Sequence, residues 1–296
     1  MLSDTSLGNA LLVGNQGNDS LFGGIGADTL VGGAGGSNLL VAGSNDALLV
    51  AGSGPSNLFG GSGADVMVGG AGASTVSSGT GATTVFAGTG AMEAFGGATT
   101  FQFVGGTNGA STVVGGSGIS TLFGGTGSNN ELIGGSGAAT IFGGANGDEL
   151  IGGGSAGDLI VAGASNETLV GSFVGGADTL VGGTGGNLEV AGTGNGVMFG
   201  GSGPDTMLAG TGNDVIVAGS GPDVLVFSNG QAGGSDEIWN FTQGTDFVFL
   251  ANYAPNIVQT ALASAVTSSG STTITLTDNT RITFGGITQL TASNFA

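Results

Sequence analysis

Apolar residues occur in this chain as short stretches that return about every nine residues, with glycine-rich stretches between them. One copy reads Gly23-Gly24-Ile25-Gly26-Ala27-Asp28-Thr29-Leu30-Val31, and close variants follow along most of the chain. This period predicts a turn over positions one to six and a short strand over positions seven to nine, whose eighth side chain points inward. The predicted interior stack comprises Leu21, Leu30, Met67, Leu122, Ile141, Leu150, Met207, Ile216 and Leu225.

Two consecutive copies should form one coil, with a strand on each face and a turn at each edge. The predicted fold class is therefore all-β: a parallel β-roll, or β-solenoid, of Gly-rich nonapeptide repeats with a small C-terminal β cap. The composition agrees, because 69 of 296 residues are Gly but only 4 are Pro, and the glycines lack the three-residue spacing of collagen. Hydrophobic residues make up 39%, which disfavours disorder. We expect no helix of useful length, since glycine is costly inside helices.

Changes in the pattern divide the chain into five segments. Residues 1–13 lead into the repeats, and residues 14–70 form a first tract with aspartates. In residues 71–142 the period continues, but Ser, Thr or Ala replaces the aspartate. Aspartates return in residues 143–227, where Glu also falls on an inward position, at 189, and leaves the register there open. Residues 228–296 contain less glycine and are predicted to form the cap, because a solenoid end exposes apolar interior and unpaired backbone.

The aspartates recur just before the predicted strands and are the candidate metal ligands. Turns stacked at strand spacing would place each carboxylate near backbone carbonyls of the neighbouring coil. Several hard oxygen donors suit Ca²⁺, whereas Mg²⁺ prefers a tight octahedron and transition metals prefer His or Cys, which this chain lacks. An isolated aspartate would instead be read as a turn residue that bonds its own backbone. The predicted ligands are Asp19, Asp28, Asp46 (in a copy read as one residue short), Asp65, Asp148, Asp158, Asp178, Asp205, Asp214 and Asp223.

These copies resemble the repeats-in-toxin (RTX) family of calcium β-rolls over roughly residues 14–227. The C-terminal region is similar to the tail that follows such repeats in proteins exported by type I secretion, over residues 234–238, 244–250 and 287–296. The resemblance implies several bound Ca²⁺ ions, a C-terminal export signal within residues 228–296, and folding outside the cell. We therefore expect an extracellular, secreted or cell-surface-associated protein.

Charge and residue types exclude several classes of function. The formal net charge is −19, with 20 acidic residues and Arg281 as the only basic side chain. Nothing can neutralise nucleic-acid phosphates or bind an anionic membrane, and no apolar stretch is long enough for membrane insertion. We expect no enzyme, because the chain has no His, Cys or Lys for acid–base or nucleophilic chemistry.

Outward-facing positions suggest what the roll contacts. Position nine is apolar in many copies, as at Phe22, Val31 and Phe86, which indicates an interface along the strands. The leading prediction is a secreted calcium-binding structural protein that forms homo-oligomers or filaments in an extracellular fibre, surface layer or biofilm matrix. The alternative is an adhesin-like module in which a flat Thr-bearing face binds ice, a polysaccharide or a cell surface. Its position-seven residues are Thr29, Thr75, Thr84, Thr112, Thr121, Thr140, Thr179 and Thr206.

Overall fold

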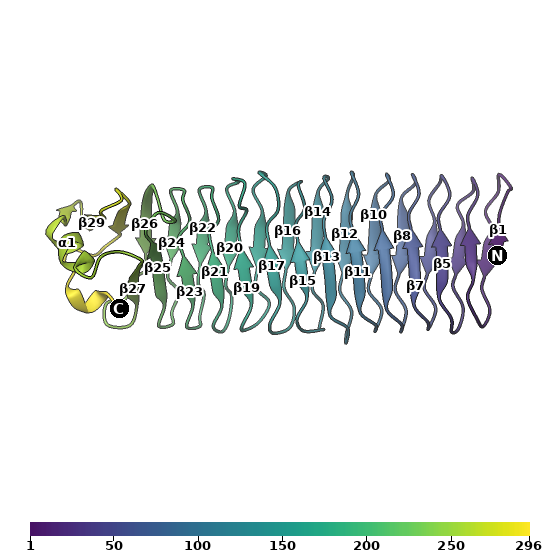
Figure 1. The fold of residues 1–296 in the computed structure, drawn as a ribbon, viewed down its shortest axis with the longest axis horizontal. Coiled ribbons are helices and arrows are strands. Elements are labelled where there is room, and N and C mark those ends of the chain that lie inside the picture. Colours follow the sequence, from purple (N-terminus) through teal and green to yellow (C-terminus); the bar gives the residue numbers. More distant parts are fainter. The chain divides into compact units, whose positions relative to one another are not determined.

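The computed structural model describes residues 1–296, which divide into two compact units, 1–148 and 149–296. Each unit is a parallel β-solenoid in which successive short strands alternate between two sheets (Figure 1). From β1 to β27, odd-numbered strands form the A sheet of each unit and even-numbered strands form the B sheet, while β28, β29 and β30 all belong to the B sheet of unit 2. The predicted all-β fold class, a parallel β-roll, is confirmed.

Unit 1 contains eight strands in each sheet. Its A sheet consists of β1 (Leu2–Ser3), β3 (Ser20–Phe22), β5 (Asn38–Val41), β7 (Ser56–Phe59), β9 (Ser74–Ser77), β11 (Met92–Phe95), β13 (Ser111–Val114) and β15 (Glu131–Ile133). Its B sheet consists of β2 (Leu11–Val13), β4 (Thr29–Val31), β6 (Leu48–Val50), β8 (Asp65–Val68), β10 (Thr83–Phe86), β12 (Phe101–Val104), β14 (Ser120–Phe123) and β16 (Ala139–Phe142).

Unit 2 continues the same alternation and ends in a cap. Its A sheet consists of β17 (Glu149–Ile151), β19 (Thr168–Val170), β21 (Leu188–Val190), β23 (Thr206–Leu208), β25 (Val224–Ser228) and β27 (Phe247–Ala251). Its B sheet consists of β18 (Leu159–Val161), β20 (Thr179–Val181), β22 (Val197–Phe199), β24 (Val215–Val217), β26 (Ser235–Trp239), β30 (Arg281–Phe284), β29 (Ser271–Thr275) and β28 (Val266–Ser268). The last three strands pair antiparallel with one another and form the predicted β cap.

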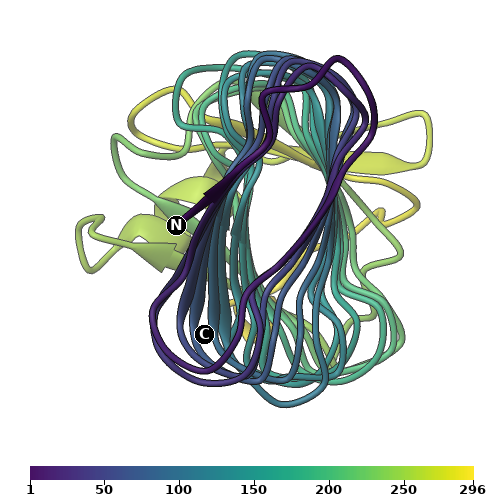
Figure 2. The same cartoon turned by 90° about the vertical axis from the view of Figure 1, so that its right-hand side faces the viewer.

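The interior of each unit is a stack of position-eight side chains. Parallel strands pair in register, so that Leu21 pairs with Leu40 and Leu40 with Leu58. All nine residues of the predicted interior stack are 0% exposed, which confirms the predicted inward positions. Seen end-on in unit 1, the strands form two opposite sides and the turns form two edges (Figure 2). We call the turns that lead into A-sheet strands the A edge, and those that lead into B-sheet strands the B edge.

The roll extends beyond the repeats that the sequence pattern reveals. β1 and β2 lie within the segment 1–13 and pair with β3 and β4. In unit 2, β26 and β27 pair with β24 and β25, so coils continue to Ala251. There the coil lengthens, because Ile216 pairs with Ile238, and this insertion hides the nine-residue period.

The region after Ala251 adds the only α-helix, α1 (Ile257–Ala263), and a short 3₁₀ helix at Ala292–Asn294. Ile257 and Ala261 are the buried residues of α1. This helix was not expected from the sequence, and its two apolar contacts span a single turn, which is too short for a periodic signal. No helix in the structure has both the length and the apolar character needed to cross a membrane.

Candidate metal sites in the turns

Position six, the residue just before position seven of each strand, lies inside the turn. Eight of the ten predicted ligands occupy it and are at most 3% exposed: Asp28, Asp65, Asp148, Asp158, Asp178, Asp205, Asp214 and Asp223. Four of them make the same pair of hydrogen bonds. Asp28 Oδ1 accepts the backbone N–H of Ala10, which is 18 residues earlier, at 2.8 Å, and its Oδ2 accepts the N–H of Gly24 at 2.7 Å. Asp65, Asp214 and Asp223 make the corresponding bonds, so each of these carboxylates ties its own turn to the preceding coil.

In unit 2 the acidic residues form two rows, because position six of one coil contacts position six of the next. At the A edge the Asp205 N–H donates to Asp223 Oδ1 at 3.0 Å, and the Asp223 N–H donates to Asp246 Oδ1 at 3.1 Å. At the B edge the Asp214 N–H donates to an Asp236 oxygen at 2.9 Å. The A-edge row is Glu167, Asn187, Asp205, Asp223 and Asp246; the B-edge row is Asp158, Asp178, Gly196, Asp214 and Asp236.

Three acidic members of these rows were not among the predicted ligands. Asp236 and Asp246 lie in the lengthened coils, and Glu167 is a different residue type at the same position. The available signal was the sequence Gly-x-Asp at 234–236 and 244–246, which repeats the end of the turn motif.

In unit 1, neutral residues at position six separate the buried carboxylates from one another. At the B edge, Ala47 lies between Asp28 and Asp65, and the Ala47 N–H donates to Asp65 Oδ1 at 2.9 Å. At the A edge, Asp19 is half-buried and its N–H donates to Asn38 Oδ1 at 3.2 Å. Further along, position six is a neutral residue in the tract 71–142; the buried polar ones are Ser74, Thr83, Ser111, Ser120 and Asn130.

Asp46 does not occupy position six. Its copy has full length, Ala47 fills the inner position, and Asp46 precedes it with an exposed side chain. The Asp46 Oδ1 accepts the N–H of Ala64 at 2.7 Å, which is the role of a turn residue. The structure therefore does not bring Asp46 together with the other predicted ligands.

Asparagine at position six closes a turn without a charge. Asn187 Nδ2 donates to the carbonyl of Gly182 at 2.6 Å and to that of Gly185 at 3.2 Å. Its Oδ1 accepts the N–H of Glu167, as an aspartate oxygen would. The amide thus donates hydrogen bonds to turn carbonyls. An aspartate at the same position could not, because an ionised carboxylate has only acceptor oxygens.

Burial raises the pKa of six position-six carboxyl groups. The pKa of Asp205 is raised to about 6 and that of Asp236 to about 7, mainly because burial removes water from the charged form. The pKa values of Asp65, Asp148, Asp214 and Asp223 are also raised by burial. A cation bound in these turns would offset that cost.

The donor set fits a hard cation. Asp205 Oδ2 and Asp236 Oδ2 are buried without a hydrogen-bond partner. Turns also approach one another closely, since a methyl group on Gly201, where φ is +97°, would lie 2.1 Å from the Gly183 carbonyl oxygen. No three acidic, His or Cys side chains converge on one point, so a metal here would need backbone carbonyls as well. Carboxylate and carbonyl oxygens of this kind are calcium ligands.

Comparison with known proteins decides the nature of the repeat. The family model of the RTX calcium-binding nonapeptide repeat matches four segments, 4–39, 41–76, 105–130 and 190–225. The chain carries RTX calcium-binding repeats. These RTX segments include most of the predicted ligands of unit 1 and the Asp205, Asp214 and Asp223 turns, and RTX repeats of this kind bind several Ca²⁺ ions.

Other comparisons add little to the RTX match. No curated protein matches the chain. Among solved structures, an extracellular lipase from Serratia marcescens is similar, with 14% sequence identity and a TM-score of 0.27. The match covers 72% of this chain and 39% of the lipase chain, so this chain spans about two fifths of the lipase's length.

Proposed function

We propose that this RTX protein is a secreted calcium-binding structural protein whose rolls self-associate into an extracellular fibre, surface layer or matrix. The observation that carries this proposal is the outer face of the B sheet in unit 1, which has no charged side chain. There position nine is apolar in all eight strands, a set that we call the B-face row: Val13, Val31, Val50, Val68, Phe86, Val104, Phe123 and Phe142.

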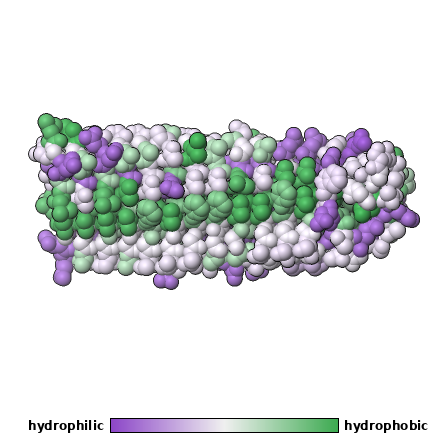
Figure 3. Space-filling view, turned by 180° about the vertical axis from the view of Figure 1, so that it is seen from behind, coloured by the Kyte–Doolittle hydropathy of each residue, from purple (hydrophilic) through white to green (hydrophobic).

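The B-face row is accessible and continuous. Phe86 is 42% exposed, and the rings of Phe123 and Phe142 stack with centroids 5.0 Å apart. Position seven of the same face adds Leu11, Leu48 and Val66 to the apolar surface. Figure 3 shows a band of apolar side chains on the face that it views. Contiguous apolar surfaces of this kind mark interaction sites.

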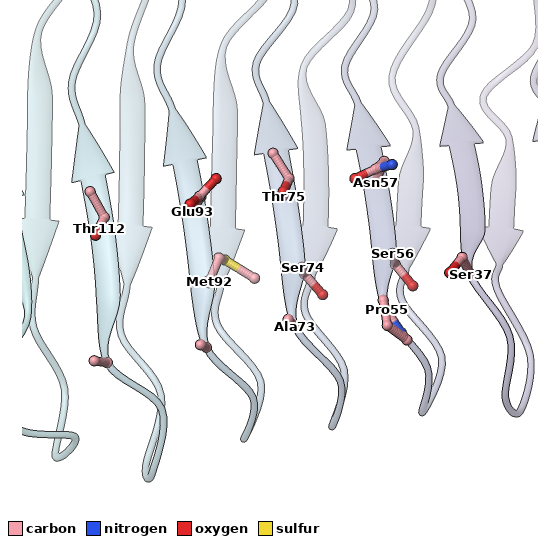
Figure 4. A pocket seen from close by; sticks show the side chains of 12 residues that line it. Ser37, Pro55, Ser56, Asn57, Ala73, Ser74, Thr75, Met92, Glu93 and Thr112 are labelled. Carbon is pink, nitrogen blue, oxygen red and sulfur yellow. The ribbon is translucent and has the colours of Figure 1, made fainter.

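The A face of unit 1 differs in charge. Asn57, Thr75, Glu93 and Thr112 lie side by side on successive strands and point outward (Figure 4). They line a groove of about 390 Å³, and Glu131 follows Thr112 in the same row. A second copy with the same net negative charge meets no like charge on the B face. We therefore assign that face to contact between copies.

Calcium would favour this association. The chain has a formal net charge of −19, and each bound Ca²⁺ offsets two negative charges. The metal-free chain therefore repels other copies more strongly than the calcium-loaded chain.

The adhesin-like alternative has weaker support. Consecutive repeats alternate between sheets, so Thr75, Thr112 and Thr206 lie on A sheets while the other predicted threonines lie on B sheets. On the B face of unit 1, Leu48 and Val66 separate Thr29 from Thr84. A regular threonine array for ice or a polysaccharide is therefore interrupted.

Electron microscopy of the purified full chain tests self-association. We expect filaments or sheets with calcium and dispersed particles with excess chelator. A double variant, Phe86→Lys with Phe123→Lys, should remain dispersed with calcium. The matched variant, Phe59→Lys with Phe95→Lys, places the same charges on the A face, where Phe59 is 42% and Phe95 is 43% exposed, and should still assemble. Dispersed wild-type monomers under both conditions would refute the proposal.

We also propose that residues 228–296 direct export. This rests on the similarity of residues 234–238, 244–250 and 287–296 to the tails of type I secreted RTX proteins. Co-expression with a type I exporter should release the full chain into the medium, and deletion of residues 287–296 should retain it in cells. Equal release of both would contradict this role.

A further inference from the structure

Glu189 breaks the interior pattern of the roll. It occupies the inward position eight of β21, where its partners in register are Leu169 in β19 and Met207 in β23. The register continues through it, although the sequence left that point open. The side chain is 0% exposed, and neither carboxylate oxygen has a hydrogen-bond partner. A buried, unpaired carboxyl group is costly whether it is charged or neutral.

The Glu189 carboxylate points toward the A edge. A methyl group on Gly182 would lie 2.4 Å from Glu189 Oε1 and 2.4 Å from the carbonyl oxygen of Gly200. These two oxygens therefore converge on the same space, at the start of two neighbouring A-edge turns. Asp205 Oδ2 is also buried without a partner, and it would lie 3.0 Å from a methyl group on Gly200.

The position of Glu189 complements the A-edge row. Asn187 interrupts that row with a neutral side chain, whose amide already bonds the Gly182 and Gly185 carbonyls. Glu189 lies two residues later in the same coil, and it supplies a carboxylate from strand β21 where the turn has none. Burial is the main cause that raises the Glu189 pKa to about 9, and the carboxylates of Asp205 and Asp223 raise it further. The three carboxyl groups are thus close enough to repel one another.

We propose that Glu189, Asp205 and the Gly200 carbonyl form an interior site for a divalent, oxygen-preferring cation, with Ca²⁺ as the occupant. The site differs from the turn sites because one ligand comes from the inward face of a strand. A cation there would partner the unpaired oxygens of both carboxylates and offset their repulsion. The inference does not depend on self-association of the rolls.

Calcium stoichiometry of the full chain tests the site. The variants are Glu189→Gln, which keeps the shape, and Glu189→Leu, which restores the residue type found at Leu169. Glu93→Gln is the control, because it removes an equal charge from an exposed outward position. After removal of free calcium, native mass spectrometry should show one Ca²⁺ fewer per chain in both Glu189 variants and no change in Glu93→Gln. Unchanged stoichiometry in the Glu189 variants would overturn the proposal.

Infrared spectroscopy gives a second test, because it reports the protonation state of buried carboxyl groups in the wild-type chain. In the wild-type chain, calcium should convert one buried protonated carboxyl group to a carboxylate, and Glu189→Gln should lack that change. A protonated-carboxyl band that belongs to Glu189 and persists in saturating calcium would show an uncharged core residue, and would overturn the site. Filament formation is measured separately, so failure of this inference and failure of the proposed function are distinguishable.

Discussion

The Asn130 side-chain amide donates a hydrogen bond to the Gly127 carbonyl at 2.7 Å. The same amide reaches the Gly124 carbonyl at 3.1 Å, so this turn of unit 1 is closed by neutral groups. Asn187 makes the equivalent bonds to Gly182 and Gly185 in unit 2. We infer that asparagine at position six replaces the cation that an aspartate turn requires.

Replacing Asn130 with aspartate should therefore create a calcium-dependent turn. The variant loses the donor to both carbonyls and places a carboxylate near Asp148, whose oxygen now accepts from the Asn130 amide at 3.0 Å. In chelator we expect the free energy of unfolding to fall by about 1–3 kcal/mol. Calcium should restore it, with one more ion bound per chain. Thermal melts in both conditions check this, and a loss that calcium leaves unrestored would contradict the inferred role of asparagine.

Asp214 and Asp46 form a matched pair for the turn sites. Asp214 is fully buried and accepts the N–H groups of Gly196 at 2.7 Å and Gly210 at 3.0 Å, whereas Asp46 is exposed. The Asp214→Asn variant places an amide donor against one of those N–H groups. We therefore expect its free energy of unfolding in calcium to fall by about 1–3 kcal/mol. Asp46→Asn should change stability by less than about 0.5 kcal/mol. Equal effects in calcium-loaded melts would argue against position six as the ligand position.

The metal-free chain should become less stable as pH rises. The ordinary pKa of Asp is 3.8, and burial raises it to about 7 for Asp236 and about 6 for Asp205. Between these values the folded state binds more protons than the unfolded state, so the free energy of unfolding falls from about pH 4 to about pH 7. Saturating calcium should weaken this dependence, because the metal favours the ionised form. Chemical denaturation in chelator across this range checks the sign, and stability that rises with pH would contradict it.

The interior of the roll was predictable because one physical requirement repeats in every copy. Leu21 and Met207 lie far apart in the sequence, yet both fill position eight and are fully buried. The distribution of the outer side chains over two faces was harder to predict from the sequence. Phe86 and Phe95 occupy the same position of neighbouring copies but lie on opposite sheets, so a single outer row predicted from the nine-residue period becomes two.

The ligand positions were predictable only where the coil length is regular. Asp205 and Asp223 follow the 18-residue coil spacing and occupy position six. Asp223 and Asp246 are 23 residues apart, and this longer coil removed Asp246 from the visible pattern. Asp46 shows the opposite case, since the side chain of an aspartate one position early is exposed. Turn insertions are tolerated because the strand register, set by apolar position eight, stays in place.

Hydrogen–deuterium exchange of the full chain, in calcium and in excess chelator, tests the central claim that calcium in the aspartate turns stabilises the roll. We predict that calcium slows exchange most in the segment 200–223, which contains Asp205, Asp214 and Asp223. The smallest change should lie in residues 71–123, where position six is uncharged. Equal exchange of residues 200–223 with calcium and with chelator would contradict the account.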